Sequence, residues 1–283
     1  MIDSLASAAL GKRGLIVALA GAVALVLSGP AFAARSHKPP TQSAPAHPAH
    51  PAEESRYQAC LVQAGPQPQK ALEQAQEWEK QGGGLAARHC QALALVGLKR
   101  YGEAAARLEE IARQPSMGSG QMRAELLDQA GNAWILANEP KKAYAALDAA
   151  LKLSPDSAEL FIDRARARAM TKDWRGATMD LSTALSLDPA REEAYVFRAS
   201  ALRQSGDLKR ALEDVETALA LNDKDADALL ERGAIRAGLG NADGARQDWT
   251  KATQVAPDSP AGRAAQANLQ GLEGSGPAAP PGS

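Results

Sequence analysis

Cysteine and histidine are the residues of this sequence with the clearest capacity for chemistry. Cys60 and Cys90 are its two cysteines, and His89 precedes the second of them. The pair can form a disulfide, remain as two buried thiols, or bind zinc together with His89. Zinc is the remotest of these hypotheses because the spacing fits no standard zinc site, and the lack of a Cys-x-x-Cys motif disfavours redox catalysis.

A catalytic site is not indicated by the remaining polar residues. His89 is the only histidine beyond residue 52, so any Ser–His or Cys–His pair would depend on it. Gly82–Gly84 is expected to form a turn between helices, not a phosphate-binding loop, and no carboxylate pair stands apart from the charged surface. We therefore expect no enzyme activity, no catalytic or metal-binding residues and no cofactor.

The composition favours helices as the elements that position these residues. Of 283 residues 45% are apolar but only 4% are aromatic, which is low for a β-sandwich or barrel. Alanine, the best helix former, is abundant. The 32 basic and 33 acidic residues give a net charge of −1, so the basic excess of a general nucleic-acid binder is missing.

The two ends of the chain have the composition of targeting and linker segments. An apolar run, Leu15–Leu27, and the small residues of Ala31–Ala33 predict a signal peptide over 1–33, cleaved on export to the periplasm. An uncleaved inner-membrane anchor is the alternative. Residues 34–52 are rich in Pro, Ala and His, and residues 273–283 in Gly and Pro, so both are expected to be disordered. We expect no membrane span after cleavage.

A period of 34 residues organises the segment from 124 to 259. It relates small residues to small ones, bulky residues to bulky ones, and prolines to one another. The small columns are Gly131, Ala165, Ala199, Gly233; Ala143, Ala177, Ala211, Ala245; and Ala150, Ala184, Ala218, Ala252. The bulky columns are Leu127, Phe161, Tyr195, Leu229 and Leu147, Leu181, Val215, Trp249, and the prolines are Pro155, Pro189 and Pro257.

Each period fits two antiparallel helices joined by a tight turn, for example Ala158–Met170 and Trp174–Leu187. Small residues let the two backbones approach where the helices cross, and bulky residues fill the space beside the crossing. A proline ends the second helix. Because one pair cannot bury its own apolar face, successive pairs must stack.

This pattern resembles the tetratricopeptide repeat (TPR) family, through Phe161, Ala165, Ala177, Leu181, Pro189 and their equivalents. The resemblance implies an all-α fold, a right-handed α-α superhelix (solenoid) of about six stacked helix-turn-helix repeats plus a C-terminal capping helix. Four 34-residue units are expected over 124–259, two degenerate units over 53–118 and the capping helix over 260–272. An insertion of about five residues is expected around Met117–Gln121.

Stacked repeats would place Cys60 and Cys90 on adjacent first helices, about one turn apart. In an oxidising compartment the natural interpretation is a disulfide between them. Two charged columns also repeat, and the family resemblance suggests ion pairs that link first and second helices. They are Arg164, Arg198, Arg232 and Asp180, Asp214, Asp248.

In this family the first helices line a concave face, and the resemblance carries this role over to twelve positions. The aliphatic and cationic mixture suits an extended or helical peptide with an acidic group, whereas Asp128, Ile162 and Val196 depart from the Lys and Asn of carboxylate-clamp members. The predicted groove comprises Asp128, Asn132, Ile135, Ile162, Arg166, Met170, Val196, Ser200, Arg203, Gln204, Leu230 and Ala234.

These observations predict an exported, non-enzymatic scaffold that binds an unidentified protein or peptide of the cell envelope. A self-associating structural spacer and an accessory domain of an envelope enzyme system are the alternatives. The partner, its affinity, the biological process and the oligomeric state are not encoded in any motif of the sequence.

Overall fold

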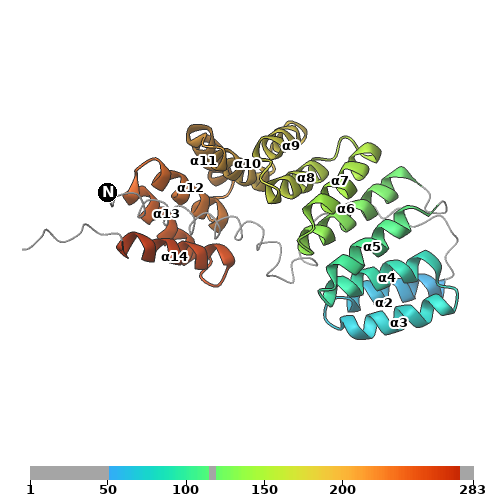
Figure 1. The fold of residues 1–283 in the computed structure, drawn as a ribbon. Helices are drawn as coiled ribbons and strands as arrows, with labels where there is room; N and C mark the ends of the chain where they lie inside the picture. Colours follow the sequence, from blue (N-terminus) through green and yellow to red (C-terminus); the bar gives the residue numbers. More distant parts are fainter. Residues whose placement is uncertain (1–50, 115–118, 275–283) are drawn as a thin grey trace, which may run out of the picture. The chain divides into compact units, whose positions relative to one another are not determined.

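A computed structural model describes residues 51–114 and 119–274, and this part of the chain consists of helices without strands (Figure 1). The prediction of an all-α helical repeat is confirmed. The predicted signal peptide, nearly all of the predicted linker and the end of the tail lie outside the described residues. The helices are α2 (Pro51–Gln63), α3 (Pro68–Lys80), α4 (Gly84–Gly97), α5 (Tyr101–Ala112), α6 (Gly120–Leu136), α7 (Pro140–Leu153), α8 (Ala158–Met170), α9 (Trp174–Leu187), α10 (Glu192–Gln204), α11 (Leu208–Leu221), α12 (Ala226–Gly238), α13 (Ala242–Val255) and α14 (Pro260–Gly274).

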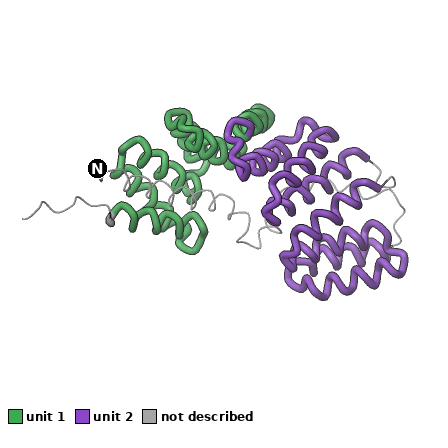
Figure 2. The backbone as a smooth tube through the Cα atoms, viewed as in Figure 1, with its two compact units in different colours: residues 1–31, 177–283 green, residues 32–176 purple. Residues whose placement is uncertain are grey.

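The helices form two compact units, drawn in purple and green in Figure 2. The N-terminal unit comprises described residues 51–114 and 119–176, and the C-terminal unit comprises residues 177–274. The boundary falls between Gly176 and Ala177, inside α9. Each unit is described below by itself.

Helix starts keep the 34-residue register. Second helices α7, α9, α11 and α13 begin at residues 140, 174, 208 and 242, and α8, α10, α12 and α14 begin at residues 158, 192, 226 and 260. The helix α14 therefore takes the place of the first helix of one more unit. It packs on the core through Ala261, Ala264 and Ala265, while Arg263 and Gln266 are exposed.

Helix boundaries differ from the prediction in three places. The helix α6 begins at Gly120, with the Ser119 side chain accepting a hydrogen bond from the Met122 amide at 3.3 Å. Residues 120–123 thus belong to α6, while Met117 and Gly118 of the predicted insertion lie outside the described residues. The helix α2 begins at Pro51, inside the predicted linker, and α14 continues to Gly274, two residues beyond the predicted capping helix.

The helix crossings pair a small residue with a bulky one, as the columns predict. A Cβ atom added to Gly131 would lie 2.5 Å from Leu147 Cγ, and one added to Gly233 would lie 2.3 Å from Trp249 Nε1. Real Cβ atoms do not approach other atoms so closely. The bulky side chains therefore occupy the space that glycine leaves, and both are buried.

The turn between the two helices of a pair needs one residue of left-handed backbone. Gly206 and Gly240 have φ of 90° and 81°, whereas Asn138 and Lys172 occupy the same position earlier in the chain with φ of 58° and 63°. Glycine and asparagine tolerate this conformation, and lysine does so at a cost.

The repeated charges form ion pairs whose side chains are largely shielded from solvent. Arg198 donates to both carboxylate oxygens of Asp214, at 2.8 and 2.7 Å, and Arg232 does the same to Asp248, at 3.0 and 2.7 Å. These bonds link the first and second helices of their units, as predicted. In the N-terminal unit Arg164 donates to Asp148 of the preceding second helix at 2.8 Å.

Candidate binding surface on the first helices

The twelve predicted groove residues lie on α6 and α8 of the N-terminal unit and on α10 and α12 of the C-terminal unit. The structure divides them into two equal groups by exposure. Buried are Ile135, Ile162, Arg166, Val196, Ser200 and Leu230. Partly exposed are Asp128, Asn132, Met170, Arg203, Gln204 and Ala234.

The aliphatic members of the set belong to the interior and offer little surface to a ligand. Ile162, Val196 and Leu230 are only 2, 6 and 4% exposed. Burial of these apolar side chains stabilises the fold by about 25 cal/mol for each Å² of apolar surface removed from water. The accessible part of the surface is therefore mostly polar, with Met170 and Ala234 as its apolar components.

A buried carboxylate organises the polar residues of the N-terminal unit. Asp163 of α8 accepts from Asn132 Nδ2 at 2.6 Å and from Arg166 Nη1 at 2.5 Å. Arg166 Nη1 also donates to Asn132 Oδ1 at 2.9 Å, and Asn132 Nδ2 donates to Asp128 Oδ1 at 3.2 Å. The four side chains tie α6 to α8.

The charges of this network are not fully compensated. The Arg166 atoms Nε and Nη2 are buried and have no hydrogen-bond partner among the described residues. Burial raises the pKa of Asp128 well above its usual range, and the neighbouring Asp163 carboxyl raises it further. The protonated form of Asp128 is thereby favoured, as expected where like charges meet in a shielded place.

His89 connects three successive first helices. Its Nδ1 lies 2.6 Å from the Tyr57 hydroxyl of α2, and its Nε2 lies 2.8 Å from Gln129 Oε1 of α6. Burial lowers the pKa of His89 and, with the charge of Glu54, raises the pKa of Tyr57 to about 12. A neutral imidazole that donates from Nε2 and accepts at Nδ1 satisfies both contacts, so His89 is a structural link.

One ion pair dominates the first helices of the C-terminal unit. Arg203 of α10 donates to the Glu231 carboxylate of α12 from Nε at 2.5 Å and from Nη2 at 3.2 Å. Both side chains are largely buried. Next to Arg203 in the sequence, Gln204 Nε2 is a buried donor with no hydrogen-bond partner within residues 51–114 and 119–274.

Sequence reasoning missed the column that joins neighbouring first helices. Gln129, Asp163 and Glu231 stand 34 or 68 residues apart, and each accepts a hydrogen bond from the first helix before it. Phe197 occupies the remaining position of the column. The spacing was a usable signal, but the residue types differ, and only the three-dimensional contacts reveal their common role.

The cysteine pair lies on the earliest first helices of the N-terminal unit. Cys60 of α2 and Cys90 of α4 form a disulfide, with their Cα atoms 5.9 Å apart. It belongs to a small buried cluster with Ala75, Trp78 and Ala87. Because the sulfur atoms are bonded to each other, the hypotheses of two free thiols and of zinc ligation do not apply to this structure.

The described residues contain no group of three or more His, Cys, Asp or Glu side chains placed to hold a metal ion. Within that same part of the chain, none of the helices has the length and apolar character needed to cross a membrane.

Comparisons with known proteins give structural likenesses and no sequence match. Neither protein-family models nor curated proteins match the chain. MamA from residue 41 to its end, from Desulfovibrio magneticus RS-1, is 19% identical, with a TM-score of 0.53 over 60% of this chain and 94% of that one. The MamA RS-1 ArsTM double mutant is 20% identical, with a TM-score of 0.51 over 59% and 93%.

YrrB, described as a TPR protein with an unusual peptide-binding site, is 20% identical to this chain. Its TM-score is 0.49, over 68% of this chain and 96% of YrrB. The stacked helix pairs with their 34-residue register identify the architecture of the chain: it has the tetratricopeptide-repeat fold.

Proposed function

We propose that the chain is an exported, non-enzymatic interaction scaffold whose first helices bind a protein or peptide of the cell envelope. The carrying observation is that these helices are joined to one another by buried polar bridges and still leave partly exposed side chains along them. Stacked helix pairs present such a surface on every unit, which suits an elongated partner.

The exposed members of the groove set indicate the chemistry of the partner. Met170 offers a flexible apolar contact. The Asn132 amide is already bonded to Asp163 and Arg166, and Gln204 Nε2 is buried. Arg166 and Arg203 are already paired with Asp163 and Glu231, so an acidic partner group would have to compete with these carboxylates. We therefore favour a partner that meets this surface through backbone amides and uncharged side chains.

The proposed compartment is the periplasm, reached through the predicted signal peptide over 1–33. The disulfide between Cys60 and Cys90 supports an oxidising location, because such bonds rarely persist in a reducing cytosol. The uncleaved inner-membrane anchor remains the alternative, and mass spectrometry of the chain recovered from cells distinguishes the two.

Self-association is the second candidate, and one observation favours it. Leu187, Leu221 and Val255, at the ends of successive second helices of the C-terminal unit, are 41, 51 and 38% exposed. Light scattering over a range of concentrations tests this hypothesis. A constant mass would remove it.

A matched pair of methionine substitutions tests the proposed surface. Met170 lies on first helix α8, whereas Met179 lies on second helix α9 and is 60% exposed. We expect Met170→Glu to lose capture of the envelope partner and Met179→Glu to retain it. Equal capture by both variants would remove the first helices from the proposal. Buried Ile162 and Arg166 are unsuitable targets because their substitution disturbs folding.

A further inference from the structure

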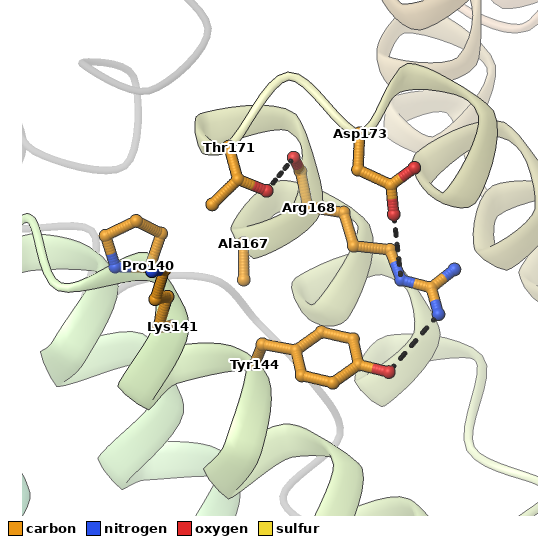
Figure 3. A pocket seen from close by; sticks show the side chains of 7 residues that line it. All are labelled: Pro140, Lys141, Tyr144, Ala167, Arg168, Thr171 and Asp173. Carbon is orange, nitrogen blue, oxygen red and sulfur yellow. Dashed lines mark hydrogen bonds and ion pairs between the residues drawn. The ribbon is translucent and has the colours of Figure 1, made fainter.

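A pocket in the N-terminal unit lies apart from the polar bridges of the first helices. It has a volume of about 280 Å³ and opens between the start of α7 and the end of α8 (Figure 3). Its lining combines two basic groups, two hydroxyl groups, a carboxylate and two small apolar surfaces. The lining residues are Pro140, Lys141, Tyr144, Ala167, Arg168, Thr171 and Asp173.

The aromatic and cationic side chains of the pocket hold each other in place. The Arg168 guanidinium carbon lies 5.3 Å from the centre of the Tyr144 ring, and Arg168 Nη2 donates to the Tyr144 hydroxyl at 3.4 Å. Arg168 Nη1 donates to the carbonyl of Gly176 at 2.8 Å. Because the Tyr144 oxygen accepts from Arg168, its own proton remains available to a ligand.

Gly176 makes this arrangement possible. Its amide donates to Asp173 Oδ1 at 2.9 Å, and a Cβ atom added to it would lie 2.1 Å from Asp173 Oδ2. Asp173 Oδ2 lies 3.8 Å from Arg168 Nε, so the carboxylate offsets one of the two positive charges of the lining. The charge of Lys141 is then left over.

Lys141 is exposed, and no ion pair joins it to another residue of the described chain. Its neighbour Lys142 behaves differently, because it lies 4.5 Å from the Trp134 ring centre and 3.4 Å from Glu139. Residues 139–142 and 168–175 together contain five basic and two acidic side chains, although the whole chain carries a net charge of −1. The rim of the pocket is thus a local positive region.

The corresponding helix joint of the C-terminal unit, where the start of α11 meets the end of α12, has different side chains. Leu212 stands where Tyr144 would be and packs against the core, and Leu239 stands in place of Thr171. Arg236, the counterpart of Arg168, donates to Asp248 at 2.9 Å. The two hydroxyl groups are therefore not general features of a helix joint in this chain, whereas the exposed lysine recurs as Lys209.

We propose that this pocket binds a carboxylate side chain of a partner polypeptide, with an adjacent apolar side chain against Tyr144 and Pro140. The single excess positive charge matches a carboxylate, and the Tyr144 hydroxyl and Lys141 ammonium supply its donors. The volume accommodates one or two side chains. This second contact point is independent of the surface proposed on the first helices.

The proposal is tested by nuclear magnetic resonance titration of the full chain with acetyl-Leu-Glu-amide. We expect saturable shifts confined to the amides of residues 141–144 and 167–173. Acetyl-Leu-Gln-amide should bind roughly tenfold more weakly, since a charge-assisted hydrogen bond contributes about that factor. Lys141→Glu should cause a similar loss, and Tyr144→Phe, which keeps the ring, a smaller one.

The control is Lys209→Glu, an exposed lysine at the equivalent position of α11. It should leave the titration unchanged. Equal binding of the two peptides, or an equal loss in Lys209→Glu and Lys141→Glu, overturns the proposal. Tighter binding of inorganic phosphate or acetate at the same amides also overturns it, in favour of a small-anion site.

Discussion

The two units solve the same stacking problem with different contacts. In the C-terminal unit, the buried apolar residues from α10 to α14 form one cluster, and ion pairs such as Arg198–Asp214 join the helices of a pair. In the N-terminal unit the core is divided among several clusters, and a disulfide and the Tyr57–His89–Gln129 chain connect its first helices. The regular repeats share their columns of small and bulky residues, whereas the degenerate ones carry a covalent link in addition.

The largest effect is expected from removing the bulkiest crossing residue of the C-terminal unit. Trp249 fills the space left by Gly233 and donates from Nε1 to the Leu230 carbonyl at 3.1 Å. Trp249→Ala should cost about 3–5 kcal/mol of unfolding free energy, because the cavity cannot collapse. Hydrogen exchange of residues 226–270 should accelerate while residues 60–112 keep their protection. An equal change in both segments would contradict the expectation that the loss of Trp249 destabilises only the C-terminal unit.

Removing the disulfide should destabilise the N-terminal unit. Replacing Cys60 and Cys90 with alanine should cost about 2–4 kcal/mol, chiefly by freeing the unfolded chain. The loss should appear as faster exchange in α2 and α4 and leave α12 and α13 unchanged. Thermal unfolding identical to that of the parent chain, measured without reductant, would show that the packing around Trp78 suffices.

A middle-sized effect is expected from an ion pair of the regular unit. Arg198→Met keeps the aliphatic stem but leaves the Asp214 carboxylate, 11% exposed, without its bidentate donor. We expect a loss of about 1–3 kcal/mol, the cost of a poorly solvated group left unpaired. Chemical denaturation measures it. Arg210→Met is the control, because Arg210 pairs with Asp207 on the exposed surface.

The N-terminal unit should also carry a pH dependence through His89. Burial lowers the pKa of the folded-state imidazole, so the neutral ring stabilises the fold fully above the unfolded value of about 6.5. This contribution is lost as the pH falls from that value through the folded-state pKa. Asp128, whose pKa is raised, acts in the opposite direction.

The His89 effect is isolated as a difference between two chains. Unfolding free energies of the parent chain and of His89→Gln, compared between pH 8 and pH 5, should differ less at the acidic end. A constant difference over this range would mean that the imidazole does not titrate differently in the two states.

The smallest effect is expected at a turn. Lys172 has a positive φ where the C-terminal unit has glycine. Lys172→Gly should stabilise the chain by about 0.5–1 kcal/mol, since relief of left-handed strain exceeds the added flexibility. Thermal unfolding detects the change, and Lys152→Gly, inside α7, should destabilise.

Much of the fold followed from the sequence because small and bulky residues recur at a fixed spacing. The columns led to α8 and α9 with their observed ends and to the capping position of α14. The start of α6 at Gly120 was not predictable, because the repeat pattern does not extend to the residues before Ala124. The cysteine pairing was predicted from the expected adjacency of first helices, and the structure has the Cys60–Cys90 disulfide between α2 and α4.

The candidate site was only partly predictable. The family resemblance gave twelve proposed groove residues, but it could not tell that Ile162 and Val196 are interior side chains. Nor could it assign Arg166 to Asp163, three residues earlier on α8, or Arg203 of α10 to Glu231 of α12. The pocket at Tyr144 depends on residues that are particular to one pair of helices. A search for repeated columns therefore could not find it.

Photocrosslinking in living cells tests the central claim most directly. A photoreactive residue is placed at Asn132 or Ala234 on first helices, or at Lys152 or Lys251 on second helices. If the first helices form the binding surface, both first-helix positions yield an adduct of the same mass and the second-helix positions yield none. Adducts from the second-helix positions alone would contradict this account.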